Sequence, residues 1–205
     1  MTALAHMAGG ADAGEDLRRI VRINEEVKAV VAVAFRINLM ALNAIFLAKR
    51  AGINARGFGV LSNELRVFSQ DLRTQMQALT AHIHACVRDV SVVLQDIRNT
   101  RLLRTAVAGV PAQRLDDLVR RRERANAEHQ LHLATLRQQL RRALEDAFQL
   151  VELGGVLAKS AKIEAAYGQG FAAALTQVSG EFDGVVEEIR NSLQALQRSD
   201  FFKNN

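Results

Sequence analysis

The sequence predicts an all-α protein, and three observations support this prediction. Its 205 residues include one proline, one tyrosine and no tryptophan. Leucine, alanine, arginine, glutamine and glutamate are abundant, and all of them favour helix. Apolar residues recur at alternating spacings of three and four over long runs, which is the heptad pattern of coiled coils. We therefore expect long amphipathic helices packed along narrow apolar seams.

The first half of the chain, residues 15–108, is expected to form a helical hairpin after a flexible N-terminus at residues 1–14. Its turn, or tip, is placed at residues 52–56, because Gly52 tolerates the positive φ that often ends a helix. The expected seam residues are Ile20, Ile23, Val27, Val30, Ala34, Ile37, Ala41, Ala44, Ala48 and Ala51 before the tip, and Phe58, Leu61, Leu65, Phe68, Leu72, Met76, Leu79, Ile83, Cys86, Val90, Val93 and Ile97 after it.

The helix after this tip carries one irregularity and a clear end. Two consecutive four-residue steps, from Phe68 to Leu72 to Met76, form a stutter that locally unwinds a supercoil. The Gly-Val-Pro sequence at residues 109–111 then ends the helix, because proline lacks a backbone donor and restricts the residue before it. We expect the chain to reverse at this distal turn.

Residues 112–202 are expected to form a second hairpin, with its tip at residues 167–170. Gly154 and Gly155 lie inside its first helix, but the apolar pattern continues in phase through them, so we expect a continuous, closely packed helix. The expected seam residues are Leu133, Leu136, Leu140, Ala143, Ala147, Leu150, Gly154, Leu157 and Ala161, then Phe171, Leu175, Val178, Phe182, Val185, Ile189, Ser192 and Leu196.

The two helices that meet at the distal turn have nearly equal lengths, about 80 Å each at ~1.5 Å per residue. Both tips then lie at the same end. The predicted fold is a long antiparallel four-helix coiled-coil bundle, made of two helical hairpins in one chain and forming one structural domain. The outer helices stop short of the distal turn, which would leave apolar residues there in water, so we expect self-association through the distal helices.

One ungapped segment, residues 35–68, contains Asn-Leu-Met-Ala-Leu-Asn from Asn38, Arg-Ala-Gly from Arg50, Arg-Gly-Phe from Arg56 and Glu-Leu-Arg from Glu64. This segment resembles the hairpin tip of the cytoplasmic signalling domain of methyl-accepting chemotaxis proteins. A match of this length is far more specific than a short motif.

A shortened copy of the same tip lies at residues 160–190, with Ile-Glu-Ala-Ala from Ile163 and Gly-Phe from Gly170. A receptor dimer builds its bundle from two hairpins, and here one chain supplies both. The resemblance implies a divergent, soluble, sensor-less, receptor-like protein of chemotaxis and signal transduction.

In that family the tip binds the chemotaxis histidine kinase and its coupling protein, and the same region packs receptors together. The resemblance implies these partners, a role in protein–protein interaction, and no catalytic residue. The positions that match the family's contact residues are Phe35, Asn38, Leu39, Leu42, Asn43, Arg50, Arg56, Phe58, Val60, Glu64 and Arg66.

Two positions depart from the family pattern. Leu47 stands where the family has a glutamate, and Ile53 stands where an acidic residue usually follows the tip glycine. Both changes remove negative charge and add apolar surface. These changes are compatible either with a different partner or with burial of this tip against another tip.

Glu187 and Glu188 resemble receptor methylation sites, which pair glutamate or glutamine with small flanking residues. Adjacent glutamates are also common on solvated helix faces, and that is the simpler interpretation.

Four potential metal ligands, His82, Cys86, His129 and His132, form a second candidate site. The pairs 82 and 86, and 129 and 132, have the helical spacing that places ligands on one face. A soluble bundle that senses a metal or haem is therefore the alternative function. No CxxC-type spacing is present, so a polar layer or surface histidines explain these residues more simply, and we expect no cofactor.

The net charge is +5, and arginines concentrate between Arg98 and Arg124. A basic helical protein that associates with nucleic acid is a further alternative, but a solvated helix surface is the simpler interpretation and we do not expect this partner.

Other function classes are disfavoured. The apolar run from Val30 to Ala34 is too short for a membrane span and precedes Arg36. The opening residues lack a secretory pattern, and Cys86 cannot form an internal disulfide. No glycine-rich loop after a strand and no nucleophile with a base is evident, so we expect a cytoplasmic protein that is not an enzyme.

Overall fold

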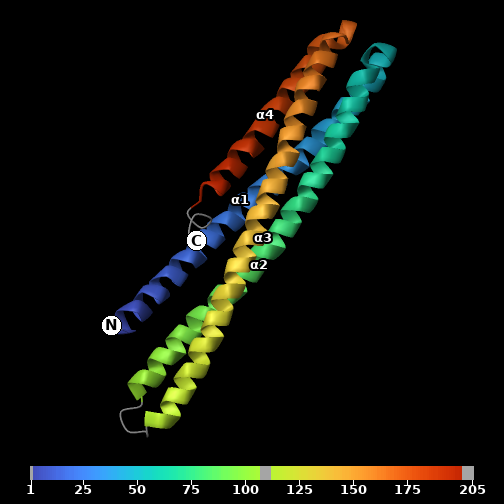
Figure 1. Cartoon of the computed structure of the whole chain (residues 1–205). Coiled ribbons are helices and arrows are strands. Elements are labelled where there is room, and N and C mark those ends of the chain that lie inside the picture. Colours follow the sequence, from blue (N-terminus) through green and yellow to red (C-terminus); the bar gives the residue numbers. More distant parts are fainter. Residues whose placement is uncertain (1, 107–111, 200–205) are drawn as a thin grey trace. The chain divides into compact units, whose positions relative to one another are not determined.

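The computed structural model describes residues 2–106 and 112–199. The α-helices are α1 (Thr2–Ala51), α2 (Arg56–Ala106), α3 (Ala112–Ala166) and α4 (Ala172–Gln197), and two 3₁₀ turns, η1 (Gly52–Ala55) and η2 (Gln169–Phe171), follow α1 and α3 (Figure 1). No strand occurs in the described ranges, so the predicted all-α class is confirmed. The predicted distal turn at residues 109–111 lies outside them.

Helix α1 begins at Thr2, so residues 2–14, for which the sequence predicted a flexible terminus, belong to a helix. The turn η1 falls within residues 52–56, and η2 overlaps residues 167–170.

The helices group into two compact units, whereas the sequence predicted one domain. The turn unit comprises Glu25–Thr80 and Arg142–Arg198 and contains both 3₁₀ turns. The terminal unit comprises Met1–Asn24, Ala81–Arg141 and Ser199–Asn205.

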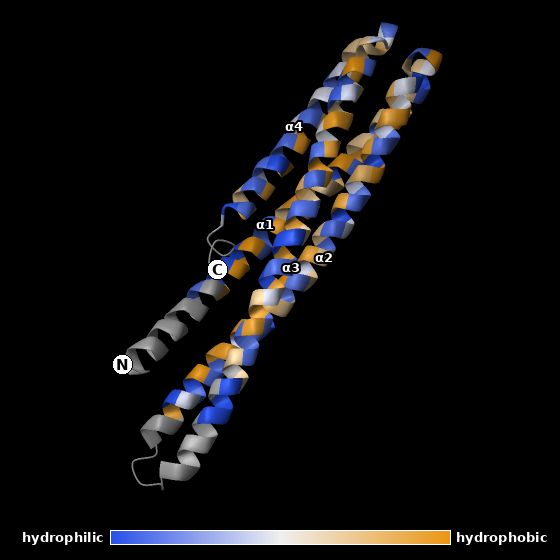
Figure 2. Cartoon of the chain, viewed as in Figure 1, coloured by the Kyte–Doolittle hydropathy of each residue, from blue (hydrophilic) through white to orange (hydrophobic). Residues whose placement is uncertain are grey.

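The core of the turn unit is the seam of apolar side chains that the heptad pattern predicts. On α1 this seam narrows to Ala41, Ala44 and Ala48 before the turn, and such small side chains let the neighbouring helices approach closely. Hydrophobic and hydrophilic residues alternate along each helix (Figure 2). Further buried seam residues are Val27, Val30, Ala34, Ile37, Phe58, Leu65, Phe68, Leu72, Met76 and Leu79, including all three residues of the predicted stutter.

On α3 and α4 the buried seam differs from the expected one by a single residue at several positions. The expected residues Ala147, Gly154 and Ala161 are buried, but every second position between Leu140 and Ala161 moves by one residue. The corrected positions are Leu144, Val151 and Ala158 in place of Ala143, Leu150 and Leu157 on α3, and Ser179 and Leu193 in place of Val178 and Ser192 on α4. On α2, Ser62 is likewise buried in place of Leu61.

Helix α3 is continuous through Gly154 and Gly155, as predicted. A Cβ on Gly154 would lie 2.5 Å from Cζ of Phe68, so the aromatic ring occupies the space that a side chain would fill. A Cβ on Gly155 would lie 2.9 Å from the guanidinium of Arg190. Both α2 and α4 therefore use this glycine pair to pack closely on α3.

Two polar contacts link the outer surfaces of the turn unit. Arg36 of α1 donates from Nη1 to Oε2 of Glu188 on α4 at 3.2 Å. Arg190 of α4 donates from Nε to Oε1 of Glu152 on α3 at 2.8 Å. Exposed pairs of this kind contribute at most about 1 kcal/mol each, so the apolar seam supplies most of the stability.

Candidate partner-binding tip

The two turns lie against each other. Gly52 has φ +74°, the left-handed conformation predicted for it, and in η2 the corresponding positive φ of 45° belongs to Gln169. The side-chain amide of Asn54 donates to Oε1 of Gln169 at 2.8 Å. Residues far apart in the sequence thus form one end of the turn unit.

A second contact joins the two turn regions. A side chain at Gly57 would collide with the carboxylate of Glu164, so the missing side chain lets Glu164 lie against the start of α2. Glu164 belongs to the Ile-Glu-Ala-Ala run of the shorter match. Residues from both turn regions therefore lie together at this end of the turn unit.

An apolar stripe on α1 points to solvent, and we name its four residues, Phe35, Leu39, Leu42 and Phe46, the α1 stripe. Phe35 is 53% exposed and Phe46 is 65% exposed. The first three were predicted as contact residues, whereas Phe46 was missed. Its spacing of four from Leu42 was a sufficient signal, because residues four apart share a helix face.

Most other predicted contact residues are also accessible, but one is not. Asn43, Arg50, Arg56, Val60 and Glu64 are exposed, and Asn38 and Arg66 are half-buried. Phe58 is fully buried, so the prediction that it contacts a partner is wrong. Its place in the heptad seam points it into the core, where it supports the turn from inside.

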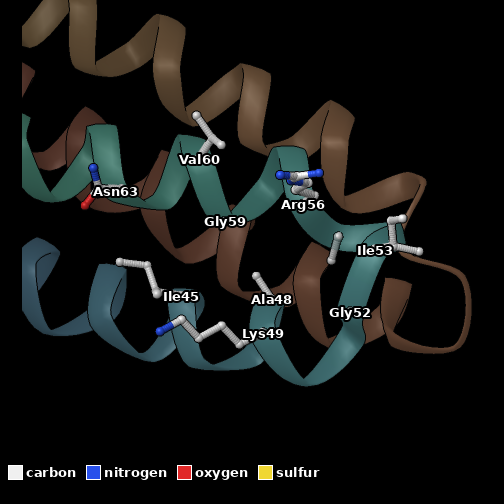
Figure 3. A pocket seen from close by; sticks show the side chains of 10 residues that line it. Ile45, Ala48, Lys49, Gly52, Ile53, Arg56, Gly59, Val60 and Asn63 are labelled. Atoms are coloured by element: carbon white, nitrogen blue, oxygen red, sulfur yellow. The ribbon is translucent and has the colours of Figure 1, made fainter.

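A groove of about 620 Å³ lies beside η1, between the end of α1 and the start of α2 (Figure 3). Its floor is narrow because a Cβ on Gly59 would lie 3.3 Å from Cβ of Ala48. Ile53, which is 83% exposed, stands at its end. The lining residues are Ile45, Ala48, Lys49, Gly52, Ile53, Ala55, Arg56, Gly59, Val60 and Asn63. The sequence did not predict this groove, because its shape depends on how two helices pack against each other.

The charged residues that line the groove, Lys49 and Arg56, are both basic. Between Glu26 and Glu64 the sequence contains no acidic residue, while five lysines and arginines fall in that stretch. Three of them, Lys49, Arg50 and Arg56, lie at the turn, and none has a carboxylate within ion-pair distance among the described residues. The residues that line the groove therefore present positive charge beside apolar surface, and Glu164 of α3 lies nearby against Gly57.

Glu187 and Glu188, the candidate modification sites, are exposed but paired. Glu187 accepts from Arg190 and Glu188 accepts from Arg36. The pKa of Arg190 is raised, mainly by its hydrogen bond to Glu152. Modification of Glu188 would remove the carboxylate that pairs with Arg36 of α1, whereas modification of Glu187 would remove a pair within α4.

The four candidate metal ligands lie in the terminal unit and do not form a cluster. Across the described ranges no three His, Cys, Asp or Glu side chains come close enough to hold a metal ion. Cys86 is buried in the seam, and burial raises its pKa to about 11, with a further rise from Asp89. His132 is exposed, with Nε2 3.3 Å from Oδ2 of Asp89. His82 and His129 are half-buried, and the geometry does not support coordination by this set.

Two apolar residues in the α2 part of the terminal unit are covered within the chain. Val90 and Val93 are buried, whereas Leu102 is 57% exposed. The two valines therefore do not need a second chain to remove them from water.

By length and composition alone, one helical stretch among the described residues, Leu17–Leu102, is apolar enough to cross a membrane. Its most apolar 18-residue window has a mean hydropathy of 2.0 and is 28% buried. The apolar run from Val30 ends before Arg36, and for that reason the sequence predicted no span there. From Ala29 to Ala48, however, Arg36 is the only charged residue. A core helix of a soluble protein meets the same criterion, so this is weak evidence for a span.

In comparisons with known proteins, the chain matches no family model, no curated protein and no solved structure.

Proposed function

We propose that this chain is a receptor-like, non-catalytic signal-transduction protein of the cytoplasm. Its tip docks onto a chemotaxis-type histidine kinase or the coupling protein of that kinase. The observation that carries the proposal is the exposure of the α1 stripe next to unpaired tip cations, at the positions where the receptor resemblance places contact residues.

The proposal includes an antiparallel four-helix arrangement, made of two hairpins in one chain. Gly57 of α2 faces Glu164 of α3, and Phe68, further along α2, faces Gly154, further back along α3. Partner numbers that fall as residue numbers rise are the signature of antiparallel neighbours. The contact between Asn54 and Gln169 supports two turns at one end.

The α1 stripe leaves apolar side chains in water, which costs free energy unless another surface covers them. Phe35 and Phe46 remain more than half exposed, although the same helix buries a full seam on its other side. Completing the burial of one such side chain is worth about 1 kcal/mol. Contiguous exposed apolar surface beside polar residues is typical of protein–protein interfaces.

The mechanism needs no chemistry from this chain. A partner bound at η1 would also affect η2, because Asn54 donates a hydrogen bond to Gln169 and Glu164 contacts Gly57. Signalling would then be a small shift in helix packing or in assembly.

A pull-down with the purified kinase and coupling protein tests the proposal. Phe35→Ala and Arg50→Ala are each expected to weaken capture about tenfold, a typical loss for a contact residue. Leu153→Ala is the matched control, because Leu153 lies on α3 and is 54% exposed, nearly the same as Phe35 at 53%. Full binding by both tip variants, or an equal loss in the control, would contradict the proposal.

A further inference from the structure

We infer that the groove beside η1 receives a short amphipathic segment of a partner protein that carries carboxylates next to apolar side chains. This inference rests on the proposed docking role of the tip and specifies the chemistry of the partner. It concerns the region where Leu47 and Ile53 replace acidic residues of the receptor pattern.

The groove has the shape to take apolar side chains. Its volume of about 620 Å³ is within the range of pockets that hold small ligands, ~300–1,000 Å³. The floor is made of Ala48, Ala55 and Gly59, which add almost no bulk, and Ile53 and Val60 form accessible apolar walls. A leucine or phenylalanine from a partner can therefore lie in the groove above these small residues.

The charges at the groove select the partner's polar side chains. Lys49 lies on α1 and Arg56 on α2, at the two sides of the groove (Figure 3). Neither cation forms an ion pair with a described residue, and Glu164, which contacts Gly57, makes none with Arg56. Like charges across an interface are strongly disfavoured, so a basic segment is rejected and an acidic one is attracted.

The depth of the groove favours a peptide over an anionic membrane surface. Ala48 is 5% exposed and Ala55 is fully buried, so the floor lies behind the walls. A flat lipid surface reaches Ile53 and Val60 but not the space behind them, whereas the side chains of a peptide can occupy that space.

The test uses the full-length chain and a fluorescein-labelled synthetic peptide of about 12 residues, ~18 Å long as a helix. One face carries leucine and phenylalanine and the other carries glutamate. A second peptide has glutamine at every glutamate. The variants are Lys49→Glu with Arg56→Glu at the groove, and Lys159→Glu with Lys162→Glu as the matched control at exposed lysines of α3. Circular dichroism checks that each variant keeps its helix.

Fluorescence anisotropy is expected to show that the acidic peptide binds at least about tenfold more tightly than the glutamine peptide. The groove double variant should lose about tenfold in affinity, while the control keeps it. Equal binding of the two peptides, or equal losses in both double variants, would overturn the inference. Vesicles of phosphatidylserine and phosphatidylcholine that bind wild type but not the groove variant, with no binding of the acidic peptide, would overturn it in favour of a membrane.

The outcomes separate this inference from the proposed function. If the kinase or coupling protein is captured equally by wild type and the groove double variant, but not by Phe35→Ala, the groove assignment fails and the docking role stands. If the acidic peptide binds as expected while neither signalling protein is captured, the groove assignment stands and the proposed partners are wrong.

Discussion

The two turn regions share one interior and differ in their exteriors. On α1 the outward face before η1 is the continuous α1 stripe. On α3 the exposed apolar residues before η2 share a helix face but fall into two pairs, Leu153 with Val156 and Ile163 with Tyr167, and Ser160 lies between the pairs on that face. A buried seam runs along the helices on both sides of each turn, whereas the outer faces differ, and the longer unbroken apolar face is the α1 stripe.

The largest expected effect comes from replacing one buried phenylalanine of α2 and one of α4. Phe58 and Phe182 are both fully buried. Phe58→Ala and Phe182→Ala should each lower the free energy of unfolding by about 3–5 kcal/mol, because each leaves a cavity. Urea denaturation followed by circular dichroism measures both losses.

Phe46→Ala is the exposed control, with an expected change within about 0.5 kcal/mol. A loss confined to one of the two buried sites would show that the interiors are packed differently.

Glycine substitutions test the close packing of the second hairpin. Gly154→Ala would press a methyl group against Phe68 and should cost about 1–3 kcal/mol. A Cβ on Gly180 of α4 would meet no atom within 4 Å, so Gly180→Ala should instead stabilise by about 0.5–1 kcal/mol. Thermal unfolding of the two variants in parallel checks the opposite signs.

Alanine substitution of a glycine in each turn should change the free energy of unfolding by a smaller amount, which differs between η1 and η2. Gly52 has φ +74°, so Gly52→Ala should cost about 1 kcal/mol. Gly170 in η2 has open space and no positive φ, so Gly170→Ala should change stability by less than about 0.5 kcal/mol. Gly52→Asn, whose side chain tolerates this conformation, should recover part of the loss. Similar unfolding midpoints for both alanine variants would mean that the two turns are equally permissive.

The smallest expected effects come from the surface arginines. Arg36 pairs with one carboxylate and Arg190 with two. Alanine at either position should cost less than about 1 kcal/mol, with the larger loss at Arg190. Both losses should shrink when about 0.5 M salt is added, because screening weakens exposed pairs. A salt-independent loss at Arg36 would point to packing of its stem.

Much of the fold follows from local pattern, because burial along a coiled coil depends on spacing alone. Gly52 and the seam before it were predictable for this reason. On α3 the alternate positions Ala143, Leu150 and Leu157 were each misplaced by one residue, since a neighbouring apolar residue fits the spacing equally well. The position of Gln169 in a left-handed conformation has no such local signal.

The candidate site was only partly predictable. Resemblance identified Phe35, Leu39 and Leu42, but it could not separate residues that support the tip from residues that face a partner, and Phe58 is of the first kind. The groove depends on the distance between α1 and α2, which is set by Ala48 and Gly59 together. The pairing of His132 with Asp89 depends likewise on the register of two helices.

The hydrogen bond between Asn54 and Gln169 has a consequence for valency. A symmetric assembly of two identical hairpins would offer a partner two equivalent binding sites. In this chain the groove lies beside η1, and the neighbouring turn η2 differs from η1. We therefore expect one-to-one stoichiometry with any partner that recognises the groove. Building a larger lattice would then require a separate contact that joins one molecule to the next.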